Sequence, residues 1–402
     1  MKELTHGIKF PLGRDKYDVW IFAICIFCLA MPYFMWQFSL KSFLIICALL
    51  SIKNIEKVNN WNKIFFAVSM IILYLYTGII SNWSFFGIIF LLLITPVFFA
   101  KSKFISQSFD VFIFIFSMML IPSILQYILV SILGVDMPHS NIIGLNTEKM
   151  GVYSQYLFML TYSGGEALID IILPRFYGYF DEPGVIGTIA AVILSVKKFN
   201  LKSWVNIPIF VAGILSFSLF FYLISFIYLF VFVKMKYKLI LIAILTMLLM
   251  YFADNEVLKY HIFDRLNFDS YFLENFSTRR DGFGFEDWYL NFKKTPQYLT
   301  GMGAGYNLVV NLGGSSYKNI ITDFGIIFFL MYLSAFLIYG IRSLGYTKEL
   351  LISLMILFGI IYQRPYIQDL LYVFLIYAPF VFFNEYKKGS FLIIKNERKP
   401  KV

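Results

Sequence analysis

Long apolar stretches separated by short polar connections repeat along almost the whole chain. A membrane-spanning helix needs about 17 to 25 mostly apolar residues, and stretches near that length occur about twelve times. The pattern therefore predicts an all-α, polytopic membrane protein that forms a single transmembrane domain over residues 1–402. We place the spans near residues 18–37, 40–52, 64–80, 84–100, 109–133, 184–196, 204–217, 218–233, 238–252, 319–341, 349–363 and 368–384.

Two segments, 134–183 and 253–318, interrupt this rhythm of short connections. Loops of such length are uncommon unless they are functional or disordered. Both contain glycine, asparagine, aromatic and aliphatic residues without a low-complexity bias. We therefore expect both to be folded loops, and the alternation of spans places both on the outer face.

Composition and charge agree with a membrane protein. Of the 402 residues, 59% are hydrophobic and only 14% are charged, whereas soluble domains are about a quarter charged. The net charge of +10 arises from lysines and arginines spread over short connections, without the patch or arm typical of nucleic-acid binding. About two thirds of these basic residues fall in segments assigned to one face, which the positive-inside rule makes cytoplasmic. We expect both termini there and no nucleic-acid partner.

The densest polar chemistry lies just before the sixth predicted span, in residues 175–187. Arg175 follows a proline, and Asp181 and Glu182 precede Pro183 and Gly184, a proline–glycine pair that suits the start of a helix. Arg175 and the positive helix N-terminus can bind an anion such as phosphate. Alternatively, Arg175 forms an ion pair with one of the two carboxylates.

The carboxylates of this segment have two interpretations as well. Burial near an apolar surface raises a carboxyl pKa toward the range useful for a general base, so Asp181 and Glu182 are candidates to accept a proton from a hydroxyl. Either residue can instead cap the helix that follows. Tyr177 supplies an aromatic ring in the same segment and is a candidate substrate contact.

The second long segment supplies more cations and aromatic residues. Apolar side chains recur at helical spacing between 283 and 294, which predicts a short amphipathic helix at the membrane face. Aromatic rings there can stack on sugars, or can simply belong to an interfacial belt that needs no ligand. The candidate residues of this segment are His261, Arg265, Arg279, Arg280 and Trp288.

Three motifs together resemble the Wzy-type O-antigen and capsular polysaccharide polymerases, within the O-antigen polymerase and ligase superfamily. They are Arg175-x-x-Gly178-x-x-x-Glu182-Pro183 before a span, the arginines followed by Trp288 and Gly301-x-Gly303-x-Gly305, and Asn319-x-x-x-Asp323-x-Gly325 at the entry to a late span. The related ligases usually carry a histidine just before that entry. Here the stretch reads Ser315-Ser316-Tyr317-Lys318-Asn319, which favours a polymerase.

The resemblance implies a GT-C-like glycosyltransferase in the bacterial inner membrane, with its active site on the periplasmic face and without metal or other cofactor. It would join oligosaccharide repeat units carried on undecaprenyl pyrophosphate, with a chain-length regulator and a flippase as partners beside the membrane lipids. Arg175 and Arg279 would neutralise the leaving pyrophosphate, and Glu182 would act on the acceptor hydroxyl. Substrate contacts would come from Asp181, Tyr177, His261, Arg265, Arg280 and Trp288.

Two other functions remain open at this point. An O-antigen ligase would share most of these motifs. A flippase or transporter of lipid-linked glycan would instead need charged groups along a path through its spans. The concentrated polar residues of this chain lie in the outer segments, which favours the enzyme.

Overall fold

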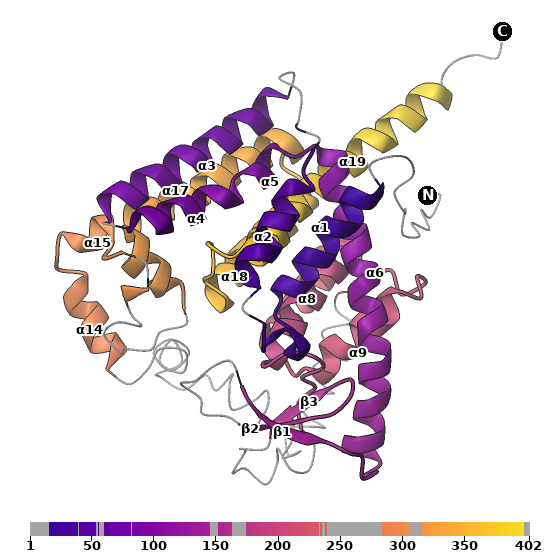
Figure 1. Ribbon diagram of the computed structural model, residues 1–402. Coiled ribbons are helices and arrows are strands. Elements are labelled where there is room, and N and C mark those ends of the chain that lie inside the picture. Colours follow the sequence, from indigo (N-terminus) through magenta and orange to yellow (C-terminus); the bar gives the residue numbers. More distant parts are fainter. Residues whose placement is uncertain are drawn as a thin grey trace. The chain divides into compact units, whose positions relative to one another are not determined.

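The computed structural model describes residues 16–38, 40–53, 55, 60–81, 83–144, 152–162, 174–232, 234, 238, 284–303, 305–306 and 316–397. This part of the chain is mostly helical (Figure 1). The chain divides into two compact units. The first contains Met1–Ile8, Phe27–Ser42 and Phe112–Phe272, and the second contains Lys9–Ile26, Phe43–Val111 and Leu273–Val402.

Among the described residues, three helices are long and apolar enough to cross a membrane. They are α3 (Trp61–Ile80), α6 (Ser102–Tyr127) with the π-helical turn η2 (Ile128–Ile132) that continues it, and α17 (Tyr317–Leu344). Several other apolar helices are shorter than a span, including α2 (Lys41–Leu50), α8 (Pro183–Val196), α9 (Asn206–Leu215) and α10 (Leu219–Phe232). The helical class is confirmed for most of the described residues. The number of about twelve spans stays a prediction.

The first predicted span is shorter than its apolar run. We expected it to reach residue 37, but α1 (Lys16–Leu29) ends eight residues earlier. Met31 has a φ of 53°, and Pro32 has an extended backbone before the 3-10 turn η1 (Tyr33–Met35). A proline disfavours helical backbone in the residue before it, so the apolar run cannot continue as one helix.

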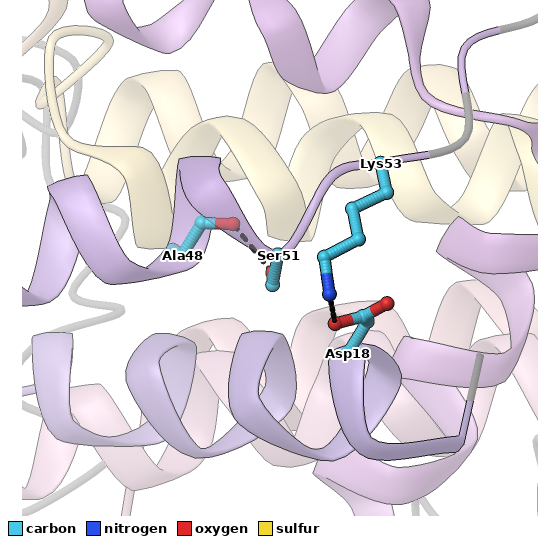
Figure 2. A network of polar contacts seen from close by, with 4 residues as sticks. All are labelled: Asp18, Ala48, Ser51 and Lys53. Atoms are coloured by element: carbon cyan, nitrogen blue, oxygen red, sulfur yellow. Dashed lines mark hydrogen bonds and ion pairs between the residues drawn. The ribbon is translucent and has the colours of Figure 1, made fainter. Parts of the chain in front are cut away.

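A polar contact joins α1 to the end of α2 (Figure 2). The Nζ atom of Lys53 lies 2.6 Å from Oδ1 of Asp18, which belongs to the first turn of α1. Beside it, the Ser51 hydroxyl donates a 2.6 Å hydrogen bond to the Ala48 carbonyl at the end of α2. The start of α1 therefore lies beside the end of α2, as in an antiparallel helix pair.

The first unit surrounds a fully buried helix. Every residue of α8 is buried, which is typical of a helix that is apolar on all sides. It packs against α9 and α10, two helices separated at Ser216–Ser218, so the predicted division of the apolar run 204–233 into two helices is confirmed. At Gly187 a Cβ atom would lie 2.1 Å from Cβ of Ser218. The closeness of this contact requires glycine.

A small antiparallel sheet in the first unit is an exception to the all-α class. Its order is β1 (Ser140–Ile143), β2 (Val152–Gln155) and β3 (Leu160–Tyr162). Tyr153 pairs with Ile142 on one side and Tyr162 on the other. These strands lie within the first long segment, where the sequence analysis predicted a folded loop without specifying its structure.

The second unit is a bundle of long helices. In it, α3 packs against α17, α4 (Phe85–Ile94) and α5 (Pro96–Phe99), and α17 also packs against α18 (Lys348–Gln363) and α19 (Leu370–Glu397) (Figure 1). Two short helices, α14 (Phe285–Phe292) and α15 (Gln297–Thr300), precede α17. A non-helical residue, Gly325, with a φ of 84° and a ψ of 159°, breaks α17 near its start.

Candidate functional site

The segment from Pro174 to Glu182 is an irregular loop fixed by hydrogen bonds to several elements of the first unit. The Tyr127 hydroxyl at the end of α6 donates to the Pro174 carbonyl at 2.6 Å. The Phe176 amide donates to the Leu215 carbonyl at 3.0 Å, at the end of α9. Because buried backbone groups need partners, these bonds define the path of the loop.

The guanidinium of Arg175 binds the turn between α9 and α10. Its Nε donates to the Ser216 carbonyl at 3.1 Å, and its Nη2 donates to the Phe217 carbonyl at 3.3 Å. Arginine has five N–H donors in a fixed plane, so two of these bonds fix the orientation of the whole group. Both acceptors are backbone carbonyls of one turn, so these two bonds hold the guanidinium beside the junction of α9 and α10.

The middle of the loop bonds to the sheet and to η1. The Leu160 amide of β3 donates to the Gly178 carbonyl at 2.7 Å, and the Tyr33 amide donates to the Tyr179 carbonyl at 2.7 Å. The rings of Tyr33 and Tyr179 also stack, with their centroids 5.7 Å apart. Gly178 has a φ of 51°, a backbone conformation that favours glycine. The glycine of the Arg175 motif thus has a conformational reason to be there.

The aromatic and acidic residues of the loop gather around Tyr153 of β2. The Tyr153 hydroxyl donates to the Asp181 carbonyl at 3.0 Å, and the Tyr177 ring lies 5.9 Å from the Tyr153 ring. Burial raises the pKa of Tyr153, and the neighbouring groups Tyr177, Asp181 and Glu182 raise it further. Both carboxylates are therefore close enough to Tyr153 to influence its ionisation.

Glu182 occupies the N-cap position of α8 without capping it through its side chain. Its backbone is extended, with a φ of −137° and a ψ of 132°, and Pro183 begins the helix. The Val185 amide donates to the backbone carbonyl of Glu182 at 3.1 Å, and the side chain makes no capping hydrogen bond. The capping role that the sequence suggested for the Glu182 side chain is therefore wrong. Glu182 is half-buried.

Four of the predicted site residues, His261, Arg265, Arg279 and Arg280, lie outside the described residues. The amphipathic helix predicted beyond them is confirmed as α14. Its aromatic residues Phe285, Tyr289 and Phe292 form a buried cluster with Ile321 of α17. The helix therefore packs its apolar face against protein.

Trp288 is part of this packing. Its ring stacks on the Phe292 ring with the centroids 5.1 Å apart, and on the Tyr306 ring with the centroids 5.9 Å apart. Trp288 also packs on the buried cluster of α14. This environment favours the second of the two predicted roles, in which Trp288 needs no sugar ligand.

The glycines of the second unit make a contact between two backbones. A Cβ atom on Gly301 would lie 2.5 Å from the Asp323 carbonyl oxygen, and one on Gly325 would lie 2.3 Å from the Leu299 carbonyl oxygen. The Met302 amide donates to the Thr322 carbonyl at 2.7 Å across the same contact. The two glycine motifs of the sequence are thus one structural feature, which we call the glycine contact (residues 299–303 with 322–325).

Two acidic residues near helix ends have different roles. Asp369 Oδ1 accepts a 3.0 Å hydrogen bond from the Leu371 amide, so Asp369 caps the start of α19. Asp323 Oδ2 accepts a 3.2 Å hydrogen bond from the Gly305 amide. Asp323 therefore fixes the turn next to the glycine contact rather than capping its own helix.

Sequence reasoning missed a buried ion pair of the second unit. Lys318 Nζ contacts Glu286 Oε2, with side-chain exposures of 5% and 32% respectively. The same ammonium lies 5.5 Å from the centroid of the Tyr289 ring. The pair joins α14 to the start of α17, 32 residues apart in the chain. Its signal in the sequence was a lysine next to the start of an apolar run.

The described residues contain no group of three or more histidine, cysteine, aspartate or glutamate side chains that could hold a metal ion. Comparison of the chain with protein-family models, with curated proteins and with solved structures gives no match.

Proposed function

We propose that this chain is an integral membrane glycosyltransferase that polymerises oligosaccharide repeat units carried on undecaprenyl pyrophosphate. The reaction takes place at the periplasmic face of the bacterial inner membrane and yields O-antigen or capsular polysaccharide. The proposal starts from the resemblance of the Arg175 and glycine motifs to the Wzy-type polymerases. Both termini are cytoplasmic in this proposal.

The observation that carries the proposal is the way Arg175 is bound. Two backbone carbonyls orient its guanidinium, in a loop that leads into the N-terminus of α8. An oriented cation and a helix N-terminus are the two elements that proteins use to bind phosphate groups. A cation held in place before the reaction stabilises developing negative charge without reorganisation.

The proposed chemistry is a displacement at the anomeric carbon of the growing glycan. A hydroxyl oxygen of the new repeat unit forms a bond to that carbon, and the bond between the carbon and the pyrophosphate oxygen breaks. Arg175 and Arg279 stabilise the negative charge of the leaving pyrophosphate. Glu182 orients the hydroxyl and accepts its proton, a role worth about 10² to 10⁴ in rate.

The positions of charged residues favour an enzyme over a flippase. A path for a charged substrate would place ionisable groups midway along the spans. In the three helices that are long enough to span, the charged side chains lie toward the ends: Lys63 in α3, Lys103 and Asp110 in α6, and Lys318, Asp323 and Arg342 in α17.

Purified protein in nanodiscs, incubated with undecaprenyl-pyrophosphate-linked repeat units, tests the proposal. We expect a ladder of glycans that grows by one repeat unit per step on a gel. Added lipid A–core acceptor should not be glycosylated, since that product would indicate a ligase. Unchanged repeat units that only cross the bilayer of liposomes would indicate a flippase, and either outcome would contradict the proposal.

A further inference from the structure

The turn between β2 and β3 has an apolar tip that is exposed at the surface of the first unit. The tip consists of Leu157, which is 71% exposed, and Phe158, which is 38% exposed. Tight turns usually contain glycine, proline, asparagine, aspartate or serine, which supply the backbone conformations and local hydrogen bonds that turns need. Two large apolar residues at this position indicate a different environment.

The backbone of this tip bonds to protein groups on both sides. The Phe158 amide donates to Oε1 of Gln126 at 2.7 Å, and the Tyr156 amide donates to the Met159 carbonyl at 2.9 Å. The Tyr33 hydroxyl contacts the Tyr156 carbonyl at 3.2 Å and lies close to the Leu157 carbonyl as well. Backbone groups need such internal partners where water is scarce. The tip therefore suits a medium of low polarity.

The bond to Gln126 fixes the tip beside the last turns of α6. From Ser102 to Ile132 the α6–η2 helix has 31 residues. At about 1.5 Å per residue it is about 46 Å long, compared with a hydrocarbon core of about 30 Å. If the helix enters the core near Lys101 and Lys103, its last turns, including Gln126, lie in the outer headgroup region.

Exposed apolar side chains continue from the tip along the end of α6. Leu125, Leu129 and Ile132 are all exposed and follow one another at a spacing of four and three residues. That spacing places them on one face of the helix. Ile143 and Val152, which pair with each other at the ends of β1 and β2, are also exposed. Ile143 and Val152 lie at the other end of β2 from the tip, so the sheet exposes apolar residues at both ends. Exposed apolar residues grouped in this way mark a membrane or protein interaction site.

We propose that the Leu157–Phe158 tip inserts into the outer leaflet of the bilayer, at the boundary between headgroups and acyl chains. The membrane is the occupant because the tip continues the lipid-facing side of a helix that is long enough to span. The β2–β3 hairpin is then seated in the membrane rather than in free solution. This inference rests on the membrane placement of the proposed function and does not depend on the polymerase reaction.

A single labelled cysteine tests this insertion. The native cysteines Cys25, Cys28 and Cys47 are replaced by alanine, and Leu157→Cys carries an environment-sensitive fluorophore in nanodiscs. Asp136→Cys, an exposed acidic position beyond the end of the α6–η2 helix, is the control. We expect at least a threefold stronger quenching of the Leu157 label by lipids with a nitroxide near the headgroup than by aqueous iodide. The Asp136 label should show the reverse.

Two results would overturn the proposal. Equal iodide quenching at both positions would place the tip in water. Shielding of the Leu157 label from both quenchers would show that protein, such as a second copy of this chain, covers it. As a further check, Tyr33→Phe removes the hydroxyl that bonds to the tip and should increase iodide quenching at Leu157. A ladder of polymer from the same sample tests the proposed function separately.

Discussion

In the first unit, a polar loop with one arginine and two carboxylates is held by hydrogen bonds to backbone carbonyls and to a tyrosine. In the second unit, two stretches of chain meet through glycine backbones, next to a cluster of aromatic rings and a buried ion pair. Both features interrupt regular helix, and both stood out in the sequence as motifs.

Their stabilisation differs in kind. In the Arg175 loop, two hydrogen bonds of the arginine go to backbone carbonyls, and the Glu182 side chain does not cap its helix. In the second unit, the lysine is paired with a carboxylate and the tryptophan is stacked on other rings. An oriented cation can stabilise charge that develops in a reaction, whereas ion pairs and stacked rings hold the elements of a fold together. We therefore propose chemistry in the Arg175 loop and structural support in the glycine contact.

The largest effect that tests this comparison comes from the glycine contact. Gly325→Ala would place a methyl group 2.3 Å from the Leu299 carbonyl oxygen at a φ of 84°. Strained backbone of this kind costs about 1 to 3 kcal/mol, and the clash with a backbone oxygen adds to it. We expect most of the protein to be lost from the folded, detergent-extracted fraction in size-exclusion chromatography.

Gly345→Ala is the matched control for that substitution. Gly345 also has a left-handed backbone, with a φ of 66°, but nothing lies within 4 Å of its Cβ position. Its backbone strain should cost about 1 to 3 kcal/mol, as at Gly325, but without the clash the variant should remain folded. Similar behaviour of the two variants would show that the glycine contact is not a tight packing feature.

The ion pair of the second unit should respond unequally to loss of either partner. Glu286→Gln leaves Lys318 without its carboxylate at 5% side-chain exposure, whereas Lys318→Met leaves Glu286 at 32% exposure, where water can solvate it. We expect a loss of about 3 kcal/mol for Glu286→Gln and about 1 kcal/mol for Lys318→Met, measured by thermal unfolding. Equal losses would contradict the claim that the burial of Lys318 decides the cost.

Trp288 distinguishes packing from sugar binding. Trp288→Phe keeps a ring that can stack on Phe292 and Tyr306, and Trp288→Leu does not. We expect Trp288→Leu to lower stability by about 1 to 2 kcal/mol and Trp288→Phe by less. Polymer yield per folded molecule should stay within twofold of the wild type for both. A larger fall in polymer yield for a stable Trp288→Phe variant would indicate that Trp288 contacts the substrate.

The smallest effect is expected at Tyr153. Its hydroxyl donates one hydrogen bond to the Asp181 carbonyl, so Tyr153→Phe should cost about 1 kcal/mol at pH 7. Burial raises the pKa of Tyr153 above its ordinary value of 10, and its contribution to stability is therefore complete below pH 10 and is lost as the pH rises further. The difference in unfolding temperature between wild type and variant should be constant from pH 7 to 9 and shrink above pH 10.

The sequence predicted helices well where apolar runs are long and unbroken. The amphipathic periodicity of residues 283–294 identified α14, and the length of the run from Trp204 to Val233 required two helices. The prediction was wrong where a single residue ends an apolar run. Pro32 ends the first predicted span early, although the residues around it are apolar. The prediction also contained no strands for the first long segment, because short strands with exposed apolar residues lack a clear alternation.

Of the candidate site, the sequence identified the residues but not their partners. Arg175 bonds to carbonyls 41 and 42 residues away, and Lys318 to a carboxylate 32 residues before it. Contacts at such separations depend on the tertiary fold, and no local pattern encodes them. The same limit explains why the Gly301 and Gly325 motifs were read as two features, although they touch.

The initial rate of polymer formation by Arg175→Lys tests whether Arg175 stabilises the leaving pyrophosphate. Lysine keeps the charge but not the planar group that bonds to the Ser216 and Phe217 carbonyls, so the cation loses its fixed orientation. With purified, correctly folded protein in nanodiscs and defined lipid-linked repeat units, we expect an initial rate about 10² to 10³ times lower than that of the wild type. A rate within threefold of wild type would contradict the assignment of Arg175 to the reaction.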